Sequence, residues 1–201
     1  MTNSPALQRR SRLGLIGLAA LFLVPLATSF FLYYGTSWRP SGGTQHGDLI
    51  QPPRPLPAIA LTPVSGGPAQ PDGLRGAWHL VFLGPADCGE ACRDSLVMTR
   101  QVRLALDKDM TRVRRVYLYP GDESPAAALA AEQPDLLLAS LAGEEGARLA
   151  AEFPSDGAPA ETGQWFLVDP LGNLMMAYPA DITPKGLLKD LERLLKLSHI
   201  G

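Results

Sequence analysis

The chain has 201 residues but only two cysteines and three histidines. A closed zinc site takes four protein ligands, and no second cysteine pair is present to complete one. Basic and acidic residues nearly cancel, with a formal net charge of −2, and no basic stripe of the kind that binds nucleic acid follows the first quarter of the chain. These scarcities argue against a structural zinc protein and predict that no nucleic acid is among the partners.

Charge is also missing from one long stretch near the N-terminus, residues 13–34, which read LGLIGLAALFLVPLATSFFLYY. At about 1.5 Å per residue this stretch is long enough to cross the hydrocarbon core of a bilayer. A cleaved signal peptide would have a shorter apolar core, of about 7–15 residues. We therefore expect an uncleaved transmembrane anchor over residues 13–34.

The arginines around this anchor predict its orientation. Three arginines precede it and one follows closely, so the positive-inside rule places residues 1–12 in the cytoplasm. The rest of the chain would then lie outside an inner (plasma) membrane, which in a bacterium is the periplasm. That compartment permits disulfide bonds.

Residues 35–57 are rich in proline and glycine and are predicted to be an extended linker. His46 lies in this segment, and we expect it to be solvated rather than to bind a metal. The globular domain is expected over residues 58–201.

Within that domain, short apolar runs alternate with stretches of helical spacing. The predicted strands are 58–62, 78–83, 113–119, 164–169 and 174–178. The predicted helices are 91–106, 124–132, 144–153 and a last helix that Thr183 caps and Pro184 begins. This order predicts an α/β fold with a mixed sheet, helices on both faces and a C-terminal hairpin.

The two cysteines, Cys88 and Cys92, lie in ADCGEAC, where the strand 78–83 gives way to a helix. On a regular helix the four-residue offset would hold them about 5–6 Å apart, which is too far for a disulfide between their β-carbons. A disulfide is thus expected only if Cys88 lies in a loop or cap position, which Gly89 makes easy. A crosslink over three residues constrains the unfolded chain little, so a purely structural role is disfavoured.

The charges near the pair leave two chemistries open. Helix amides favour the thiolate form, whereas Asp87 and Glu90 oppose it and Arg93 offsets part of their effect. Two thiolates in acidic surroundings would attract a soft cation such as Cu(I). For disulfide exchange we expect Cys88 to be the more exposed nucleophile and Cys92 the resolving thiol.

Three stretches resemble the Sco (SenC) family: GAWHLVFLGPADCGEAC around the cysteines, LAGEEGARLAAEF, and the hairpin WFLVDPLGNLMMAY. The resemblance runs over about residues 58–197. It implies a thioredoxin-like fold and a membrane-tethered assembly factor for cytochrome c oxidase. Such a factor binds copper through Cys88, Cys92 and a histidine, and either delivers the metal or reduces the cysteines of the oxidase copper centre.

The chain departs from the family at the expected histidine, because Glu161 occupies that position. His79 is expected to be a core residue of a buried strand, and His199 lies near the C-terminus, so the third copper ligand is unknown, with Glu161 and His79 as candidates. Gly89 replaces the family proline after the first cysteine. The cis-proline of thioredoxin-like reductases is also missing near Gly163.

Three functions remain open from the sequence. The first is a Sco-like assembly factor that acts through Cys88 and Cys92, in Cu(I) transfer or in reduction of a partner's cysteines. The second is a general membrane-tethered thiol–disulfide oxidoreductase, and the third is a non-catalytic binding or scaffold protein with the same fold. The sequence does not decide whether the chain is an enzyme.

Overall fold

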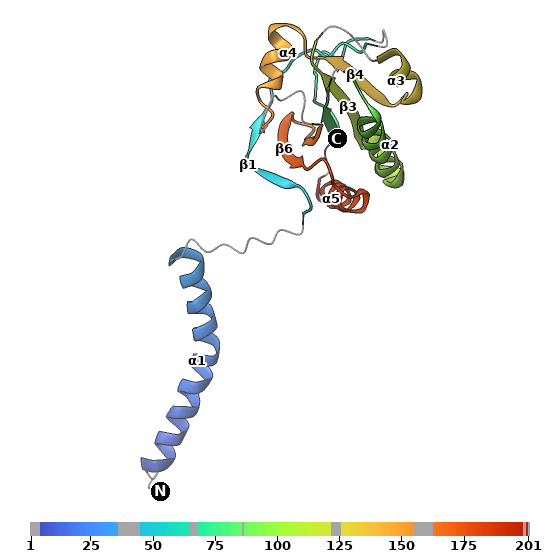
Figure 1. Ribbon diagram of the computed structural model, residues 1–201. Helices are drawn as coiled ribbons and strands as arrows, with labels where there is room; N and C mark the ends of the chain where they lie inside the picture. Colours follow the sequence, from blue (N-terminus) through green and yellow to red (C-terminus); the bar gives the residue numbers. More distant parts are fainter. Residues whose placement is uncertain are drawn as a thin grey trace. The chain divides into compact units, whose positions relative to one another are not determined.

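The computed structural model describes residues 5–35, 45–64, 68–85, 87–121, 126–154, 163–198 and 200. They belong to two units, Met1–Thr44 and Gln45–Gly201. The first unit contains one long helix, α1 (Pro5–Gly35), drawn in blue in Figure 1. Its segment Arg12–Gly35 has 24 residues, a mean hydropathy of 2.3 and no buried residue. By length and composition this segment is able to span a membrane, as the sequence predicts.

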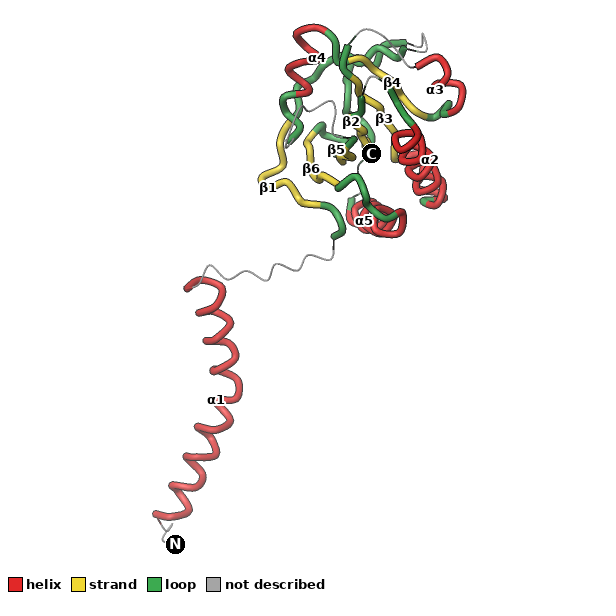
Figure 2. The backbone as a smooth tube through the Cα atoms, in the orientation of Figure 1, coloured by secondary structure: helices red, strands yellow, loops and turns green. Residues whose placement is uncertain are grey.

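The second unit is built on one mixed sheet of six strands in the order β1-β6-β5-β2-β3-β4. The strands are β1 (Asp48–Pro55), β2 (Trp78–Leu83), β3 (Val113–Tyr119), β4 (Leu136–Ser140), β5 (Gln164–Val168) and β6 (Asn173–Tyr178). β2, β3 and β4 run parallel, whereas β5 is antiparallel to β2 and forms a hairpin with β6. Figure 2 shows these strands in yellow, with the helices around them in red.

Helices cover both faces of this sheet. They are α2 (Glu90–Ala105), α3 (Ala126–Glu132), α4 (Gly143–Ala150) and α5 (Pro184–Leu197), with a 3₁₀ helix η1 (Asp107–Arg112) after α2. α2 and α5 pack side by side on one face, here called the α2/α5 face. α4 packs on the other, here called the α4 face, through residues such as Leu149.

Side chains of β2 alternate between the two faces, as the pleat of a strand requires. Trp78, Leu80 and Phe82 join the core of the α2/α5 face, and Val81 and Leu83 join the core of the α4 face. All six residues of β2 are buried. The continuous apolar run in the sequence therefore reflects a central strand covered on both sides.

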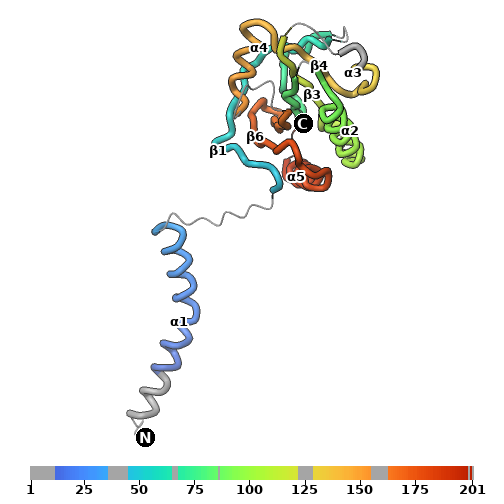
Figure 3. The backbone as a smooth tube through the Cα atoms, viewed as in Figure 1, coloured from blue at the N-terminus to red at the C-terminus, as the bar shows by residue number. Residues whose placement is uncertain are grey.

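The predicted linker 35–57 and the predicted strand 58–62 are corrected by the structure. Residues Asp48–Pro55 form β1, which pairs antiparallel with β6, whereas residues 58–62 contain only an isolated bridge between Leu61 and Gln70. Figure 3 shows β1 in cyan beside β6 in red, although they lie far apart in the sequence. The prolines suggested an extended linker, but an edge strand tolerates proline because only one side of it needs hydrogen bonds.

The other predicted elements agree with the structure to within about three residues where they are described; the largest difference is α4, which ends at Ala150 and not at Phe153. Thr183 caps α5 by accepting a hydrogen bond from the Gly186 N–H at 3.2 Å. The strand β4 has no predicted counterpart, since its segment LLLAS is too short and uniformly apolar to distinguish from helix.

Candidate functional site at the start of helix α2

The two cysteines lie where β2 passes into α2. Gly89 is the N-cap residue of α2, so Cys88 lies just outside the helix and Cys92 lies in its first turn. The pair forms a disulfide, with the two Cα atoms 5.3 Å apart. This distance is within the usual range for a disulfide. The expected condition for closure, a non-helical Cys88, is therefore met.

The exposure of the two cysteines differs from expectation. Cys88 is only 4% exposed and belongs to the core of the α2/α5 face, whereas Cys92 is half-buried. The prediction that Cys88 is the more exposed cysteine is thus wrong for the disulfide form. The physical reason is that Cys88 packs within the core of the α2/α5 face, whereas Cys92 packs against the margin of that core.

A cleft of about 450 Å³ opens beside Cys88. It is lined by Asp87, Cys88, Gly89, Glu90, Arg93 and Asp94. Three carboxylates and one guanidinium therefore surround the approach to the disulfide. The Arg93 Nε donates to the Cys88 carbonyl oxygen at 3.3 Å, and its guanidinium lies 3.6 Å from Glu132.

Tyr117 of β3 lies beneath the disulfide and was not among the residues that the sequence singled out. Its hydroxyl oxygen is 3.8 Å from the Cys92 Sγ, and the hydroxyl donates a hydrogen bond to the Pro85 carbonyl. Burial, and after it the nearby Asp87, raises the pKa of Tyr117 well above its usual range. The hydroxyl therefore keeps its proton over the physiological pH range.

Other aromatic rings hold Tyr117 in this position. The Phe82 ring lies 5.4 Å from the Tyr117 ring and 4.6 Å from the Trp165 ring, and the Trp165 Nε1 donates to the Ser95 Oγ of α2 at 2.7 Å. A Cβ at Gly84 would lie 2.6 Å from Phe82 and 2.8 Å from the Tyr117 hydroxyl. A glycine at position 84 thus leaves the space that the tyrosine hydroxyl occupies.

Tyr117 could have been found from the sequence only by assuming the strand pairing. Phe82 and Tyr117 are register partners in the parallel β2–β3 pair. Because β2 leads directly to the cysteines, the residue opposite Phe82 has to lie close to them. The alternation in VRRVYLY indicates which residues share a face, but it does not show the register.

His79, a candidate third ligand, lies away from the cysteines. It is fully buried in β2, where its side chain alternates onto the α4 face, and it pairs in register with Arg114 and Val168. Among the described residues, neither ring nitrogen has a partner of good hydrogen-bond geometry, and a weaker interaction with the Ala77 backbone offsets only a little of the pKa shift caused by burial. Burial, with a smaller effect of Arg114, lowers the pKa of His79 from 6.5 to about 4. It is a neutral core residue in this structure.

The other candidate ligands do not complete a metal site in the part of the chain that is described. Glu161 and His199 lie outside the described residues. Among the residues that are described, no three histidine, cysteine, aspartate or glutamate side chains come together to hold a metal ion.

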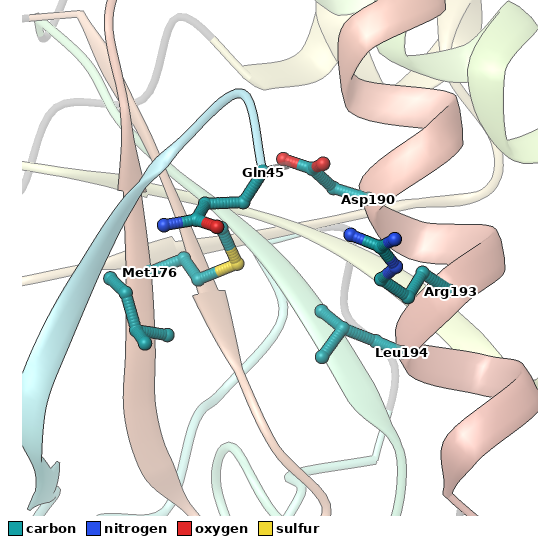
Figure 4. Close-up of a pocket in the computed structure, with 6 residues that line it drawn as sticks. Gln45, Met176, Asp190, Arg193 and Leu194 are labelled. Carbon is teal, nitrogen blue, oxygen red and sulfur yellow. The ribbon is translucent and has the colours of Figure 1, made fainter. Parts of the chain in front are cut away.

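His46, from the predicted linker, contacts α5 instead. The buried carboxylate of Asp190 accepts hydrogen bonds from the backbone N–H groups of His46 at 2.8 Å and Gly47 at 3.1 Å, and lies 3.1 Å from the His46 Nδ1. Beside it is a cavity of about 150 Å³. Figure 4 shows Asp190 and Arg193 of α5 facing Met176 of β6 across this space. The arrangement fixes the point where the chain enters the domain.

Comparisons with known proteins agree with this fold. Residues 78–198, more than half of the chain, match a family model described as a transmembrane-like, thioredoxin-like, C-terminal domain. No curated protein matches the sequence.

Solved structures of Sco proteins have the same fold. ScoI of Bradyrhizobium japonicum with copper bound is 24% identical, with a TM-score of 0.53, over 69% of this chain and 98% of that one. Yeast Sco1 with copper bound is 17% identical, with a TM-score of 0.57, over 73% and 91%. BsSco, a Sco-family cytochrome c oxidase assembly protein with a disulfide switch, is 14% identical, with a TM-score of 0.54, over 75% and 99%.

Proposed function

Since the chain belongs to the family of transmembrane-like, thioredoxin-like C-terminal domains, we propose that it is a membrane-anchored, Sco-like assembly factor for a respiratory cytochrome oxidase. Its Cys88–Cys92 pair would keep the copper-site cysteines of the oxidase reduced. The observation that carries this proposal is a disulfide at the start of a helix, beside an open cleft. The Sco fold and the disulfide switch named for BsSco support it.

The membrane anchor supports the same function. α1 has the length and composition to cross a membrane, and the arginines before it favour a cytoplasmic N-terminus. The domain would then lie in the periplasm or another extracytoplasmic space, where disulfide exchange takes place.

The exchange needs only the two thiols of this chain and a disulfide of the partner. The Cys88 thiolate attacks one sulfur of the partner disulfide, so a Cys88–partner bond forms and the other partner sulfur leaves as a thiolate. The Cys92 thiolate then attacks the Cys88 Sγ, which forms Cys88–Cys92 and releases the second partner thiolate. Two electrons pass to the partner, and a dithiol reductant in the same compartment has to restore the pair.

Cu(I) transfer is a second candidate, supported by the donor set. Two sulfurs in acidic surroundings fit a soft monovalent cation once the pair is reduced. A site with a third, nitrogen ligand does not fit the described residues, because His79 lies on the α4 face and His46 contacts α5. Copper would therefore be a cargo held by Cys88 and Cys92 alone.

The test uses the full-length chain in detergent, fully reduced and mixed with a synthetic peptide that has one intramolecular disulfide. We expect one peptide disulfide to be reduced per chain by the wild type. Cys92→Ser should stop at a mixed disulfide on Cys88, and Cys88→Ser should lose the reaction. If the wild-type chain leaves the peptide oxidised, the exchange function is wrong.

Two further measurements separate the remaining candidates. Competition with a Cu(I) chelator should show one Cu(I) per reduced chain, lost in both serine variants, if copper transfer is the function. In cells, a Cys88→Ser/Cys92→Ser double variant should lose oxidase activity. Full oxidase activity in that strain would instead indicate a scaffold or a general oxidoreductase.

A further inference from the structure

We propose that Tyr117 is a positioning residue for the disulfide chemistry: its hydroxyl donates a hydrogen bond to the Cys92 sulfur when the disulfide opens. The inference rests on the proposed function in taking Cys88–Cys92 as the reacting pair and Cys88 as the cysteine that is attacked. It concerns the intrinsic reactivity of that pair, whatever the partner is.

The proposed exchange assigns the attack of an incoming thiolate to Cys88. Cys88 borders the cleft and Cys92 does not, but only 4% of Cys88 is exposed in the disulfide form, while Cys92 is half-buried. The attack at Cys88 therefore follows from the proposed exchange and not from the exposure of the two sulfurs. Attack on the Cys88 Sγ forms a bond between the incoming sulfur and Cys88 and breaks the Cys88–Cys92 bond. The electron pair of the broken bond then stays on the Cys92 Sγ, which leaves as a thiolate. Any group that stabilises this thiolate favours opening of the disulfide.

Tyr117 is placed to be that group. Its hydroxyl oxygen is already 3.8 Å from the Cys92 Sγ in the disulfide form. The hydroxyl proton is donated to the Pro85 carbonyl there, because a disulfide sulfur carries no charge and accepts hydrogen bonds weakly. Once Cys92 becomes a thiolate, rotation about the C–O bond can turn the same proton toward the stronger acceptor.

The surrounding charges make such a donor necessary. Asp87, Glu90 and Asp94 lie around the cleft and disfavour another negative charge. The one cation of the cleft, Arg93, contacts the Cys88 carbonyl and Glu132. Besides the amides of the first turn of α2, the Tyr117 hydroxyl is a donor close to Cys92, with its oxygen 3.8 Å from the Sγ.

The raised pKa of Tyr117 supports this role, because the hydroxyl always has a proton to donate. The space beside Gly84 supports it too, since any larger residue there would meet the hydroxyl at 2.8 Å. Both features point to a hydroxyl held at a fixed place next to the sulfur.

Tyr117→Phe removes the hydroxyl and keeps the ring, and Tyr119→Phe is the matched control. Tyr119 is also buried in β3, its ring lies 6.0 Å from that of Tyr117, and no contact joins its hydroxyl to the cysteines among the hydrogen bonds of the described residues. Both variants are made in the full-length chain in detergent. The measurements are the rate of disulfide reduction by dithiothreitol and the redox equilibrium with glutathione.

A hydrogen bond to a charged group changes an equilibrium constant by about tenfold or more. We expect dithiothreitol to reduce the disulfide of Tyr117→Phe about tenfold more slowly than that of the wild type. The redox equilibrium should shift about tenfold toward the disulfide, which makes the potential of the pair about 30 mV more negative. Tyr119→Phe should stay within about twofold of the wild type. If Tyr117 had only a structural role, Tyr117→Phe would not change the potential while the unfolding temperature of its disulfide form stayed that of the wild type.

The inference is wrong if Tyr117→Phe keeps the wild-type rate and potential, or if Tyr119→Phe changes them equally. If Tyr117→Phe does not fold, the ¹³C resonance of the Tyr117 Cζ in the wild type decides. It should shift on reduction, with the Tyr119 resonance unmoved, and no shift would overturn the inference. Dithiothreitol and glutathione are not the biological partner, so this comparison is independent of whether the chain reduces an oxidase.

Discussion

Tyr117 and His79 are two fully buried polar rings on neighbouring strands, and they face opposite sides of the sheet. Tyr117 lies on the α2/α5 face, with a hydroxyl that is bonded to Pro85 and adjacent to the disulfide. His79 lies on the α4 face, and neither of its ring nitrogens has a well-formed hydrogen bond to another described residue. The same degree of burial thus places one ring beside the disulfide and the other in the core alone. The two rings differ in the face of the sheet on which they lie and in the end of the strand to which they are nearer.

The strongest way to sharpen this comparison is to replace His79 with leucine. An unfolded histidine has a pKa near 6.5, and burial lowers the pKa of His79 to about 4 in the folded chain. Between these pH values the unfolded state binds a proton that the folded state does not, so the stability of the wild type falls as the pH falls from 6.5 to 4. The loss amounts to about 3 kcal/mol at pH 4.

His79→Leu should remove this contribution to the pH dependence, which unfolding curves at pH 7 and pH 4.5 would measure. Its redox potential should match that of the wild type, because His79 does not contact the cysteines. If both proteins lose stability equally on acidification, the assignment of His79 as a neutral core residue is wrong.

The second prediction concerns Asp190, a buried carboxylate in which both oxygens have hydrogen-bond partners. Both N–H groups, of His46 and Gly47, donate to the same oxygen, the Asp190 Oδ2. Asp190→Asn can keep an oxygen there only by turning its NH₂ group toward the His46 Nδ1, and the hydrogen bonds that remain lose the charge of the acceptor. We expect a loss of about 2 kcal/mol in unfolding free energy and faster proteolysis near Gln45. Asp181→Asn, at an exposed position before α5, is the control and should change neither.

As with His79, the redox potential should be unaffected by Asp190→Asn. A change in potential there would instead mean that the Asp190 contacts and the disulfide are coupled.

The smallest effect is expected from the charges of the cleft. With three carboxylates and one guanidinium around Cys88, the disulfide should react faster with a cationic thiol than with an anionic one, by about threefold at low salt. Neutralising Asp87, Glu90 and Asp94 to their amides should remove the preference, as should high salt. Parallel rates with cysteamine and mercaptopropionate give the measurement. An unchanged preference in the amide variant would refute the electrostatic explanation.

The sequence alone predicted the mixed α/β fold, the position of the two cysteines where a strand passes into a helix, and the capped α5, because each depends on local patterns. The pattern of Leu187, Leu191 and Leu195 indicates one buried helix face, and the cysteine spacing with Gly89 between the cysteines indicates how the disulfide can close. The sequence-based prediction of β1 was wrong. The prolines in Asp48–Pro55 are typical of a linker, and only the pairing with β6 makes that segment a strand.

Sequence reasoning also considered His79 and passed over Tyr117, for a related reason. A histidine attracts attention as a possible ligand wherever it lies, whereas a tyrosine in a strand resembles any core aromatic. Their distances from Cys88 and Cys92 depend on strand register and on the face of the sheet. Neither is encoded within a single strand, so only the assembled sheet shows which of the two belongs to the site.

The central claim, that Cys88–Cys92 is an exchanging pair rather than a structural crosslink, is tested most directly by one redox titration. The full-length chain in detergent is equilibrated with glutathione buffers, and the fraction of disulfide is measured by alkylation and mass spectrometry. Exchanging proteins have potentials of about −120 to −270 mV, and structural disulfides lie below about −300 mV. We predict a two-electron transition within the first range. A pair that stays oxidised below about −300 mV would contradict the proposed function.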